Sequence, residues 1–497
     1  MPSSRRWVSR RPTSSFAPRA ERPEPPTPRP LEGVLAPRTV HNRSVTPLFV
    51  ENALVIGMTR EGDVVRDGAL LVEEGAIAAL HGEARRRAAE MASAGRPLER
   101  LDASGLWLLP GFVQTHVHLC QTLLRNGPDD LPLLSWLSAH VFPGEAALDE
   151  ETMEVSARLG LAELISGGTT ALLDMGSVRH TDAIFRAAAA SGARVTSGNA
   201  LMDDHTGASP ALRTTTRDGL DETSRLAARW QGAGDGRLRV AFSPRFALSC
   251  TEEGLRGAAE RAREGGFLLH THAAENREEI RLVRERTGRS NLRYLHDVGF
   301  SGPDVVLAHV VHADGDDRAL LAERGTNVAH CPSSNLKLSS GICPVADYLS
   351  RGIRVTLGAD GAPCNDRLDP FSEMRLAAQL SRVSPGSPPL SAWEVVRMAT
   401  ADGARALGLA GTGTIETGNR ADLVLLDPEA GFAAPTAWRG DPYGPIVWSF
   451  DRGHVAATYA DGRALFRRAA PSPASELRPS AAEVTAAVEK LSAGRHL

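Results

Sequence analysis

The chain of 497 residues is 42% hydrophobic and 23% charged, which is typical of a globular protein with ample core. Its formal net charge of -4 and pI near 6.4 argue against a nucleic-acid or anionic-membrane surface and favour a small-molecule partner. No stretch reaches the ~18 apolar residues of a membrane helix. The five cysteines are scattered and form no CxxC pair, so we expect reduced thiols and a cytoplasmic protein without a membrane partner.

The two ends of the chain differ from its middle. Residues 1–45 are rich in Arg, Pro and Ser and lack apolar periodicity, which predicts a disordered extension. Short β-type segments follow over 46–104 and return over 411–470, which predicts a small β-sandwich domain built from both termini. The tail, 471–497, contains "SAAEVTAAVEKL", whose Ser and Glu have capping-box spacing, so we expect a docked C-terminal helix.

Between these parts, residues 105–410 alternate Val/Leu-rich strand patterns with helical patterns. The first helix is expected to begin after Asp149 and to end at Gly167 and Gly168. Eight strands that alternate with helices predict a (β/α)8 barrel, whose active site lies at the C-terminal ends of its strands. The strand candidates read "LWLLPGFVQTH", "TTALLDM", "ARVTSGNALM", "LRVAFSPRF", "FLLHTHAAE", "VVLAHVVH", "TNVAHCP" and "RVTLGADG".

Candidate metal ligands stand at three of these strand ends. His116 and His118 are two residues apart in a strand, so their side chains share a face. His272 ends the fifth strand and Asp360 ends the eighth. Three imidazoles and one carboxylate suit one divalent ion with a position open for water, zinc being favoured and ferrous iron the alternative. His270 lies on the same face of the strand as His272, but deeper in the barrel. We expect it to pack in the core or to hydrogen-bond to a metal ligand.

Two further residues are candidates for proton transfer. Glu275 follows His272 by three residues at the mouth of the barrel, where we expect it to shuttle protons. The alternative is an ordinary carboxylate at a helix N-terminus, where the helix dipole stabilises its negative charge. His309 ends the sixth strand beside the other ligands, and we interpret it as catalytic rather than as a packed core histidine. His312 and His330 are interpreted as structural or supporting residues. The fourth strand, "VAFSPRFAL", offers no lysine or acid to bridge a second ion, so one metal is expected.

Four motifs resemble the amidohydrolase superfamily, in particular its aminohydrolase branch of purine-type deaminases and s-triazine hydrolases, over about residues 46–470. They are "PGFVQTHVHLCQTLLRNGPDDLPLLSWL", "HTHAAENREE", "AHCPSSNLKLSSG" and "LGADGAPCNDRLDPFSEMRLAA". The resemblance implies the same four metal ligands and hydrolytic deamination. It assigns proton acceptance from water to Asp360, orientation of the nucleophile to His309, and protonation of the substrate ring nitrogen to Glu275, while the metal lowers the pKa of water.

Substrate contacts are less firmly marked. Gln121, Glu145 and Arg245 fall where the relatives place substrate contacts, yet each could be an ordinary polar residue. Homocysteine-binding members carry an arginine on the third strand where this sequence has Asn199, which favours an uncharged 5′ group. Asp366 stands where many relatives have a second Asn, so this position also departs from their pattern.

The leading hypothesis is a metal-dependent deaminase of an adenosine-like nucleoside such as 5′-deoxyadenosine, 5′-methylthioadenosine or S-adenosylhomocysteine. A guanine or 8-oxopurine deaminase is the close alternative, because "PRF" and "DLPLLSWL" resemble guanine deaminase. An s-triazine chlorohydrolase or aminohydrolase stands further away. A non-catalytic scaffold is disfavoured, since every ligand and acid–base residue is present. A homo-oligomer is compatible with the sequence.

Overall fold

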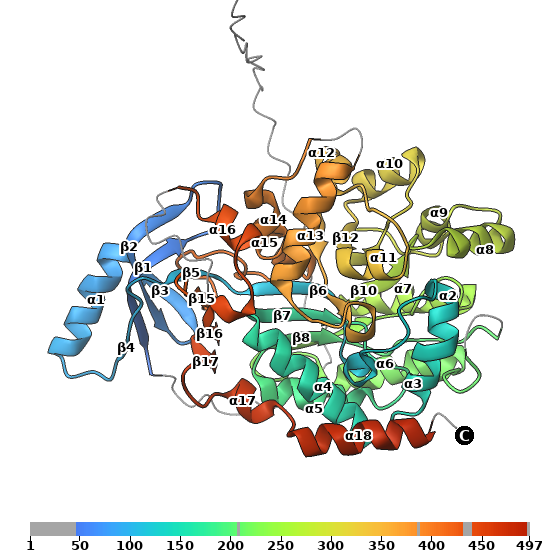
Figure 1. Ribbon diagram of the computed structural model, residues 1–497, viewed down its shortest axis with the longest axis horizontal. Coiled ribbons are helices and arrows are strands. Elements are labelled where there is room, and N and C mark those ends of the chain that lie inside the picture. The colour runs from blue at the N-terminus through green and yellow to red at the C-terminus, as the bar shows by residue number, and fades with distance from the viewer. Residues whose placement is uncertain (1–45, 206–208, 385–387, 431–439, 495–497) are drawn as a thin grey trace, which may run out of the picture. The chain divides into compact units, whose positions relative to one another are not determined.

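The middle of the chain forms a closed barrel in the computed structural model, which describes residues 46–205, 209–384, 388–430 and 440–494 (Figure 1). The parallel strands follow the order β13-β12-β11-β10-β9-β8-β7-β6-β14. Since β13 and β14 are separated only by Gly358 and Ala359, they form one interrupted eighth strand, and its two halves pair with β12 and β6 to close the sheet. The predicted (β/α)8 fold is confirmed, whereas the expected extension over 1–45 lies outside the described residues. The barrel strands are β6 (Phe112–His118), β7 (Thr169–Asp174), β8 (Arg194–Ser197), β9 (Leu238–Phe242), β10 (Leu268–Ala273), β11 (Val305–His309), β12 (Asn327–His330), β13 (Val355–Leu357) and β14 (Asp360–Gly361).

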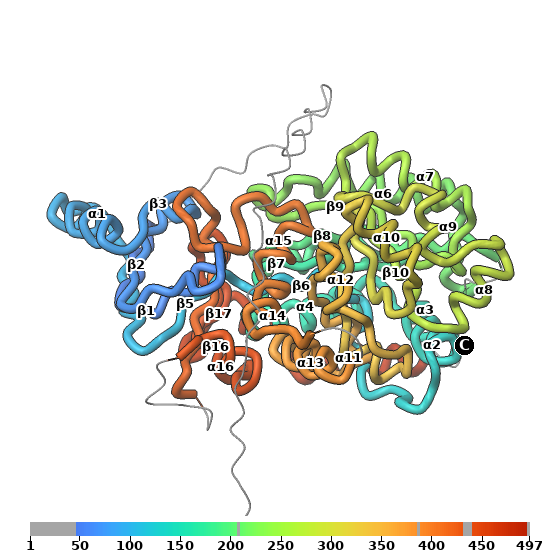
Figure 2. The backbone as a smooth tube through the Cα atoms, turned by 90° about the horizontal axis from the view of Figure 1, so that it is seen from above, coloured from blue at the N-terminus to red at the C-terminus, as the bar shows by residue number. Residues whose placement is uncertain are grey.

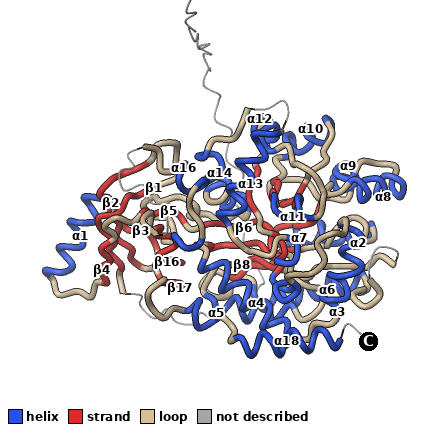
Figure 3. The backbone as a smooth tube through the Cα atoms, in the orientation of Figure 1, coloured by secondary structure: helices blue, strands red, loops and turns tan. Residues whose placement is uncertain are grey.

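Helices connect successive barrel strands (Figures 2 and 3). The first long one, α4 (Glu150–Ser166), begins where predicted, because the Asp149 carboxylate accepts from the Thr152 N–H in a capping box. It ends at Gly167, and its apolar stripe is buried against the barrel. The later connections contain α5 (Thr181–Ser191), α6 (Thr216–Trp230), α7 (Glu252–Gly265), α8 (Arg277–Thr287), α9 (Asn291–Asp297), α10 (Gly315–Arg324), α11 (Pro332–Lys337), α12 (Val345–Ser350), α13 (Pro370–Val383), α14 (Ala392–Met398) and α15 (Ala401–Ala406).

The segment between β6 and α4 is helical but irregular. It consists of η1 (Leu119–Leu124), α2 (Leu133–Trp136), the π-helical η2 (Leu137–Val141) and α3 (Phe142–Ala146). Its apolar side chains form a cluster of their own with residues from later loops, including Phe246 and Leu338. Turns of π-helix are rare and often occur at functional sites, so we expect this segment to border a site at the mouth of the barrel.

A second sheet is built from both ends of the described chain, as expected. Its order is β17-β16-β15-β5-β1-β2-β3, and β4 pairs with β1. Buried residues of both ends, such as Leu70 and Tyr459, belong to one core cluster. Helix α1 (His81–Ser93) packs on β2 through Ala84 and Ala88, while α16 (Tyr443–Trp448) precedes β16. The strands are β1 (Leu48–Ile56), β2 (Val64–Glu73), β3 (Ala76–Leu80), β4 (Glu99–Asp102), β5 (Trp107–Pro110), β15 (Leu423–Leu426), β16 (Val455–Ala460) and β17 (Arg463–Arg467).

The C-terminal helices pack on the barrel helices. Helix α18 (Ala481–Gly494) begins after Ser480, whose hydroxyl accepts from the Glu483 N–H while the Glu483 carboxylate accepts from the Ser480 N–H, so the predicted capping box is present. Its Leu491 is buried in the cluster that contains α4, and α17 (Pro473–Leu477) lies before it. Across the described ranges, no helix combines the length and apolar character that crossing a membrane requires.

A buried arginine joins the barrel to the second sheet. Arg194 on β8 donates from Nε to Asp422 Oδ2 at 2.5 Å and from Nη2 to Oδ1 at 3.1 Å, and it also pairs with Asp461. Asp461 has additional partners in Arg237 and Arg420, so the carboxylate that depends most on Arg194 is Asp422. All three side chains of the Arg194 network are buried.

Replacing Arg194 with Met should therefore lower the free energy of unfolding by about 3–5 kcal/mol, the usual cost of leaving a buried charge uncompensated. Chemical denaturation checks this value. Arg281→Met on exposed α8 serves as the control, because its ion pair with Glu285 is solvent-exposed and worth little. An Arg194→Met protein as stable as the Arg281→Met protein would contradict the bridging role.

Candidate active site

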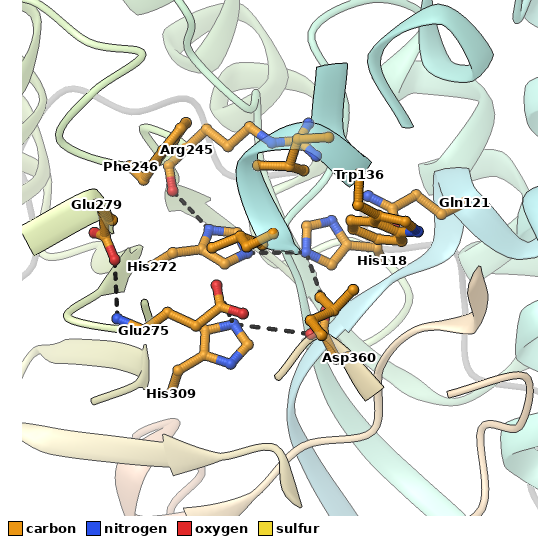
Figure 4. Close-up of a pocket in the computed structure, with 13 residues that line it drawn as sticks. His118, Gln121, Trp136, Arg245, Phe246, His272, Glu275, Glu279, His309 and Asp360 are labelled. Carbon is orange, nitrogen blue, oxygen red and sulfur yellow. Dashed lines mark hydrogen bonds and ion pairs between the residues drawn. The ribbon is translucent and has the colours of Figure 1, made fainter. Parts of the chain in front are cut away.

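Polar side chains from three barrel strands meet at the mouth of the barrel (Figure 4). His116 and His118 lie on β6, His272 on β10 and Asp360 at the start of β14. The His116 ring centroid is 4.9 Å from that of His118 and 4.7 Å from that of His272. The structure thus brings together all four side chains that the sequence singled out as metal ligands.

Hydrogen bonds fix which nitrogen carries a proton in two of these rings, His116 and His272. His270 Nδ1 donates to the Val306 carbonyl oxygen at 2.9 Å, so its Nε2 accepts from His116 Nδ1 at 2.8 Å. His116 Nε2 then carries a lone pair and has no hydrogen-bond partner among the described residues. His272 is fixed in the same way, because its Nδ1 donates to the Arg245 carbonyl oxygen at 2.7 Å. Such outer hydrogen bonds are how proteins orient metal-binding imidazoles.

The free nitrogens point at one another and at a carboxylate. Asp360 Oδ1 lies 3.3 Å from His116 Nε2 and 3.4 Å from His118 Nε2. His118 Nε2 is 3.1 Å from His272 Nε2, and one possible ligand atom from each of the four residues lies within 4.8 Å of the others. Three ring nitrogens and a carboxylate oxygen this close together in a buried site form a donor set that fits a divalent metal ion such as zinc.

The protonation states of these four side chains also favour metal binding. Burial lowers the pKa of His116 and takes the pKa values of His118 and His272 well below the ordinary histidine value. Burial by itself would raise the pKa of Asp360, but the neighbouring rings of His116 and His309 outweigh it and hold that pKa well below the usual range. At neutral pH the site therefore presents neutral imidazoles and a carboxylate, the forms that bind metals.

Two other groups of described residues bring possible ligands together, and each includes one of the thiols that the sequence analysis expected to be reduced. Burial raises the pKa of the Cys331 and Cys120 thiols well above the ordinary value. Both thiols are therefore protonated at neutral pH and would have to lose a proton to bind a metal, whereas the imidazoles of the four-residue set would not. The groups are His116, His309, Cys331 and Asp360, and His118, Cys120 and Glu145.

The two candidate proton-transfer residues lie beside Asp360. His309 Nε2 is 3.6 Å from Glu275 Oε2 and 3.8 Å from Asp360 Oδ2. Burial raises the pKa of Glu275 to about 7. Burial would lower the pKa of His309, but the Glu275 and Asp360 carboxylates outweigh it and raise that pKa. A carboxyl group that titrates near neutrality suits general acid–base work.

The backbone is strained at these strand ends. Ala274, His309, Val310 and Asp360 have φ values of 47°, 69°, 45° and 61°. Residues other than glycine seldom adopt positive φ, and a β-branched residue such as Val310 is a clear outlier there. Strain of about 1–3 kcal/mol per residue persists only where the surrounding structure enforces it, which is most often at a functional site.

The three candidate substrate contacts also come together, but they bind one another. Arg245 donates from Nη1 to Glu145 Oε2 at 2.7 Å and from Nη2 to Oε1 at 3.0 Å. Gln121 Nε2 donates to Glu145 Oε1 at 2.7 Å, and all three side chains are buried. Gln121 and Arg245 line the pocket, whereas Glu145 is absent from the described lining residues and lies behind them. Glu145 thus orients the guanidinium and the amide that face the pocket.

A concave pocket opens over these groups at the mouth of the barrel, the kind of surface at which small molecules bind. Its floor is polar, and apolar side chains from the irregular helical segment and from later loops form its walls (Figure 4). The apolar wall residues are Leu133, Trp136, Leu137, Phe246 and Leu338. This combination suits a partly apolar ligand with a few polar atoms.

Other residues from the sequence analysis lie outside the pocket lining. Asn199 Nδ2 donates to the carbonyl oxygens of Ser177 and Val178, and His312 Nε2 donates to the Ser340 carbonyl oxygen. His330 is buried, which lowers its pKa to about 3. The sequence analysis missed the residues that touch the acid–base pair: Glu279, Asn335 and Ser340.

Comparison with known proteins fits this geometry. The family model for the amidohydrolase family matches residues 107–465, most of the chain. The chain belongs to the amidohydrolase family. Among curated members, it is 35% identical to a 5′-deoxyadenosine deaminase of Methanosarcina acetivorans over 84% of this chain and 92% of that protein. It is 38% identical to a 5-methylthioadenosine/S-adenosylhomocysteine deaminase of Symbiobacterium thermophilum, over 84% and 93%.

Solved amidohydrolase structures share the fold of this chain. An adenosine deaminase of Xanthomonas campestris with bound zinc is 28% identical, with a TM-score of 0.79 over 90% of this chain and 99% of that one. E. coli guanine deaminase is 27% identical, with a TM-score of 0.77 over 85% and 100%. The family is metal-dependent, and the histidine and aspartate cluster of this amidohydrolase fits a divalent ion.

Proposed function

We propose that this amidohydrolase removes the amino group of an adenosine-like purine nucleoside by hydrolysis and releases ammonia. The candidate substrates are 5′-deoxyadenosine, 5′-methylthioadenosine and S-adenosylhomocysteine, which the names of the curated relatives suggest. The observation that carries the proposal is the meeting of metal-type ligands with a carboxyl group whose pKa is about 7 on the floor of one pocket. The barrel over 105–410 is the proposed catalytic domain, and the five free, buried cysteines support a cytoplasmic location.

His116, His118, His272 and Asp360 would hold one divalent ion, zinc in preference to iron, as the zinc in the Xanthomonas relative suggests. Such an ion supplies Lewis acidity, which lowers the pKa of water enough for attack at neutral pH. Assembly into a homo-oligomer is compatible with this proposal and plays no part in it.

The side chains beside these ligands divide the proton transfers. Asp360, ionised at neutral pH, accepts the proton of the attacking water at Oδ2, the oxygen nearer His309. His309 presents Nε2 between Asp360 and Glu275 and orients the water. Glu275, partly protonated near pH 7, donates to the ring nitrogen beside the attacked carbon. The proton that Asp360 accepted then passes to the amino group, which leaves as ammonia, while the new hydroxyl group gives its proton to Glu275 and becomes the carbonyl oxygen. The amino group is thereby replaced by oxygen from water.

Guanine or an 8-oxopurine is the second candidate substrate. The observation that favours it is the Arg245 guanidinium in the pocket lining, held in a fork by Glu145, because an arginine can donate to a purine carbonyl oxygen. The similarity to E. coli guanine deaminase is compatible with this alternative.

An ammonia-release assay separates these functions. Purified protein with its metal content measured is given 5′-deoxyadenosine, 5′-methylthioadenosine, S-adenosylhomocysteine, guanine and a chlorinated s-triazine, and chloride release is measured for the triazine. We expect about one divalent ion per chain and the highest kcat/KM with an adenosine-like nucleoside. Preference for guanine would support the second candidate. Metal-loaded protein that releases ammonia from none of the purines would contradict both.

Replacing Arg245 with Lys tests the proposed substrate contact. Lysine keeps a positive charge beside Glu145 but loses the planar fork, so we expect KM to rise about 10-fold or more, the cost of one charge-assisted hydrogen bond. Metal content and the unfolding midpoint should stay near those of the wild type. Arg281→Lys on the surface of α8 is the matched control. An unchanged KM and an unchanged substrate preference would show that Arg245 is only structural.

A further inference from the structure

One stretch of chain touches both proton-transfer residues. The 332–341 segment consists of α11 and the turn that follows it, after barrel strand β12. Asn335 Oδ1 lies 2.9 Å from His309 Nδ1, and both side chains are fully buried. Because an amide oxygen can only accept, His309 Nδ1 carries the proton. His309 Nε2 is then the nitrogen that faces Glu275 and Asp360.

The same segment orients the carboxyl group of Glu275. Ser340 Oγ donates to Glu275 Oε1 at 3.1 Å, and Ser340 is buried. Oε1 is therefore occupied as an acceptor, which leaves Oε2, the oxygen nearer His309, to carry the proton that is transferred. The Glu279 carboxylate accepts from the Glu275 N–H at 2.9 Å and so fixes the backbone on the other side.

The two orienting residues are tied to each other. The Ser340 N–H donates to the Asn335 carbonyl oxygen at 2.8 Å, so a shift of one moves the other. Between them, Leu338 forms part of the apolar pocket wall. Neither Asn335 nor Ser340 is among the described residues that line the pocket, so neither is placed to touch a ligand directly.

Both ends of α11 are anchored to neighbouring elements. At its start, Glu373 on α13 accepts from the Ser333 N–H at 3.1 Å and from the Ser333 hydroxyl. At its end, Lys337 Nζ donates to the Pro363 carbonyl oxygen at 3.0 Å and pairs with Asp366, in the loop that follows Asp360. Asp366, which stands where many relatives have Asn, also accepts from the Asn126 N–H of the irregular helical segment. These bonds hold the segment in one position relative to the metal-ligand carboxylate.

We propose that Asn335 and Ser340 are positioning residues of the reaction: one segment sets the orientation of His309 through Asn335 and that of Glu275 through Ser340. The proposal rests on the deaminase function proposed above. The proposal gives a function to polar side chains of the "SSNLKLSS" stretch, none of which is a proposed metal ligand. Loss of either bond leaves the acid–base side chain in place but free to turn, which slows chemistry without weakening binding.

The kinetic test is a double-mutant cycle between Ser340 and Glu275. Ser340→Ala should lower kcat about 3–10-fold, the effect of one neutral hydrogen bond, with KM within twofold and metal content unchanged. In a Glu275→Gln background the same change should have no further effect, because the group it orients no longer transfers a proton. Ser340→Thr should restore part of the loss, since it keeps the hydroxyl. Ser492→Ala, an exposed hydroxyl on α18, is the control and should leave kcat unchanged.

Several kinetic outcomes would overturn the proposal for Ser340. These are an unchanged kcat in Ser340→Ala, a rise in KM alone, or the same loss of kcat in both backgrounds, since each would mean that Ser340 does not act through Glu275.

The Asn335 contact can be measured without any substrate. In metal-loaded protein labelled with ¹⁵N-histidine, and at a pH high enough for the His309 ring to be neutral, His309 should carry its proton on Nδ1. Asn335→Leu should mix the two tautomers while leaving the signals of His312 in place, because His312 bonds the Ser340 backbone instead. If the wild type turns over none of the test purines, the proposed function fails, yet the tautomer experiment still decides this step. An identical His309 spectrum in Asn335→Leu would overturn the role of Asn335.

Discussion

Asp360→Ala is expected to give a folded protein that has lost both its metal and its activity. Asp360 Oδ1 is within 3.4 Å of two imidazole nitrogens, and Oδ2 faces His309, so one substitution removes a ligand and the proposed proton acceptor together. Because these roles belong to one catalytic unit, we expect kcat to fall by about 10⁴-fold or more. Elemental analysis of the purified protein should find well under one ion per chain. Ammonia release measures the activity.

The fold should survive this change. The ligand imidazoles of His116 and His118 are neutral at neutral pH because burial lowers their pKa values, so removing the carboxylate leaves no buried charge unpaired there. His309, whose pKa Asp360 helps to raise, keeps the Glu275 carboxyl group beside it. Circular dichroism should therefore match the wild type. Glu285→Ala on the surface of α8, where the acidic side chain is half exposed, is the matched control for loss of a carboxylate. Full metal content together with wild-type turnover in Asp360→Ala would refute the proposed centre.

The metal-type cluster was predictable because it depends on two regularities. Alternation along a strand places His116 and His118 on one face, and a parallel barrel gathers the carboxyl ends of its strands at one edge. Both rules hold whatever the loops do. The sequence also indicates that His270 shares a strand face with His272. Its hydrogen bond to His116 could not be predicted, because it depends on the distance between two strands that are far apart in the chain. That distance is a property of the packed barrel.

The polar contacts that orient the pocket residues could not be predicted. Glu145 and Arg245 are 100 residues apart, and nothing in "FPGEAAL" or "SPRF" indicates that the two side chains bind each other rather than a ligand. Asn335 and Ser340 were part of a quoted motif, but a polar residue in a loop has many possible partners. Only the packed loops show that these two contact His309 and Glu275.

Two strands that the hydrophobic pattern predicts as continuous are interrupted at glycines: β5 is separate from β6, and β13 is separate from β14. The sequence indicates one strand over "LWLLPGFVQTH", yet β5 pairs with β1 and β15 in the second sheet, while β6 enters the barrel. Gly111 separates them, and a Cβ there would lie 2.2 Å from the Thr170 side chain. In the eighth strand, a Cβ on Gly358 would lie 2.7 Å from the His116 carbonyl oxygen. These glycines allow close approach of neighbouring strands, and periodicity treats them only as gaps.

Glu275→Gln is the substitution that isolates proton transfer from metal binding. Glutamine has nearly the same shape and can still accept from Ser340, but it cannot give up a proton at neutral pH. Because Glu275 is not one of the four proposed ligands, metal content should stay at the wild-type level. We expect kcat to fall about 10²–10⁴-fold, the usual contribution of a general acid–base residue.

The pKa of Glu275 also predicts how kcat depends on pH. Burial raises the pKa of Glu275 to about 7, so the protonated donor is abundant below that pH and disappears as the pH rises through it. The wild-type kcat should fall on the alkaline side of pH 7, and the residual rate of Glu275→Gln should lack that decline. Glu279→Gln is an informative comparison, because the Glu279 carboxylate holds the Glu275 backbone without facing His309 at bonding distance, so its effect should be smaller. A Glu275→Gln enzyme with near-normal kcat, or with the wild-type alkaline decline, would assign the proton donor to another group.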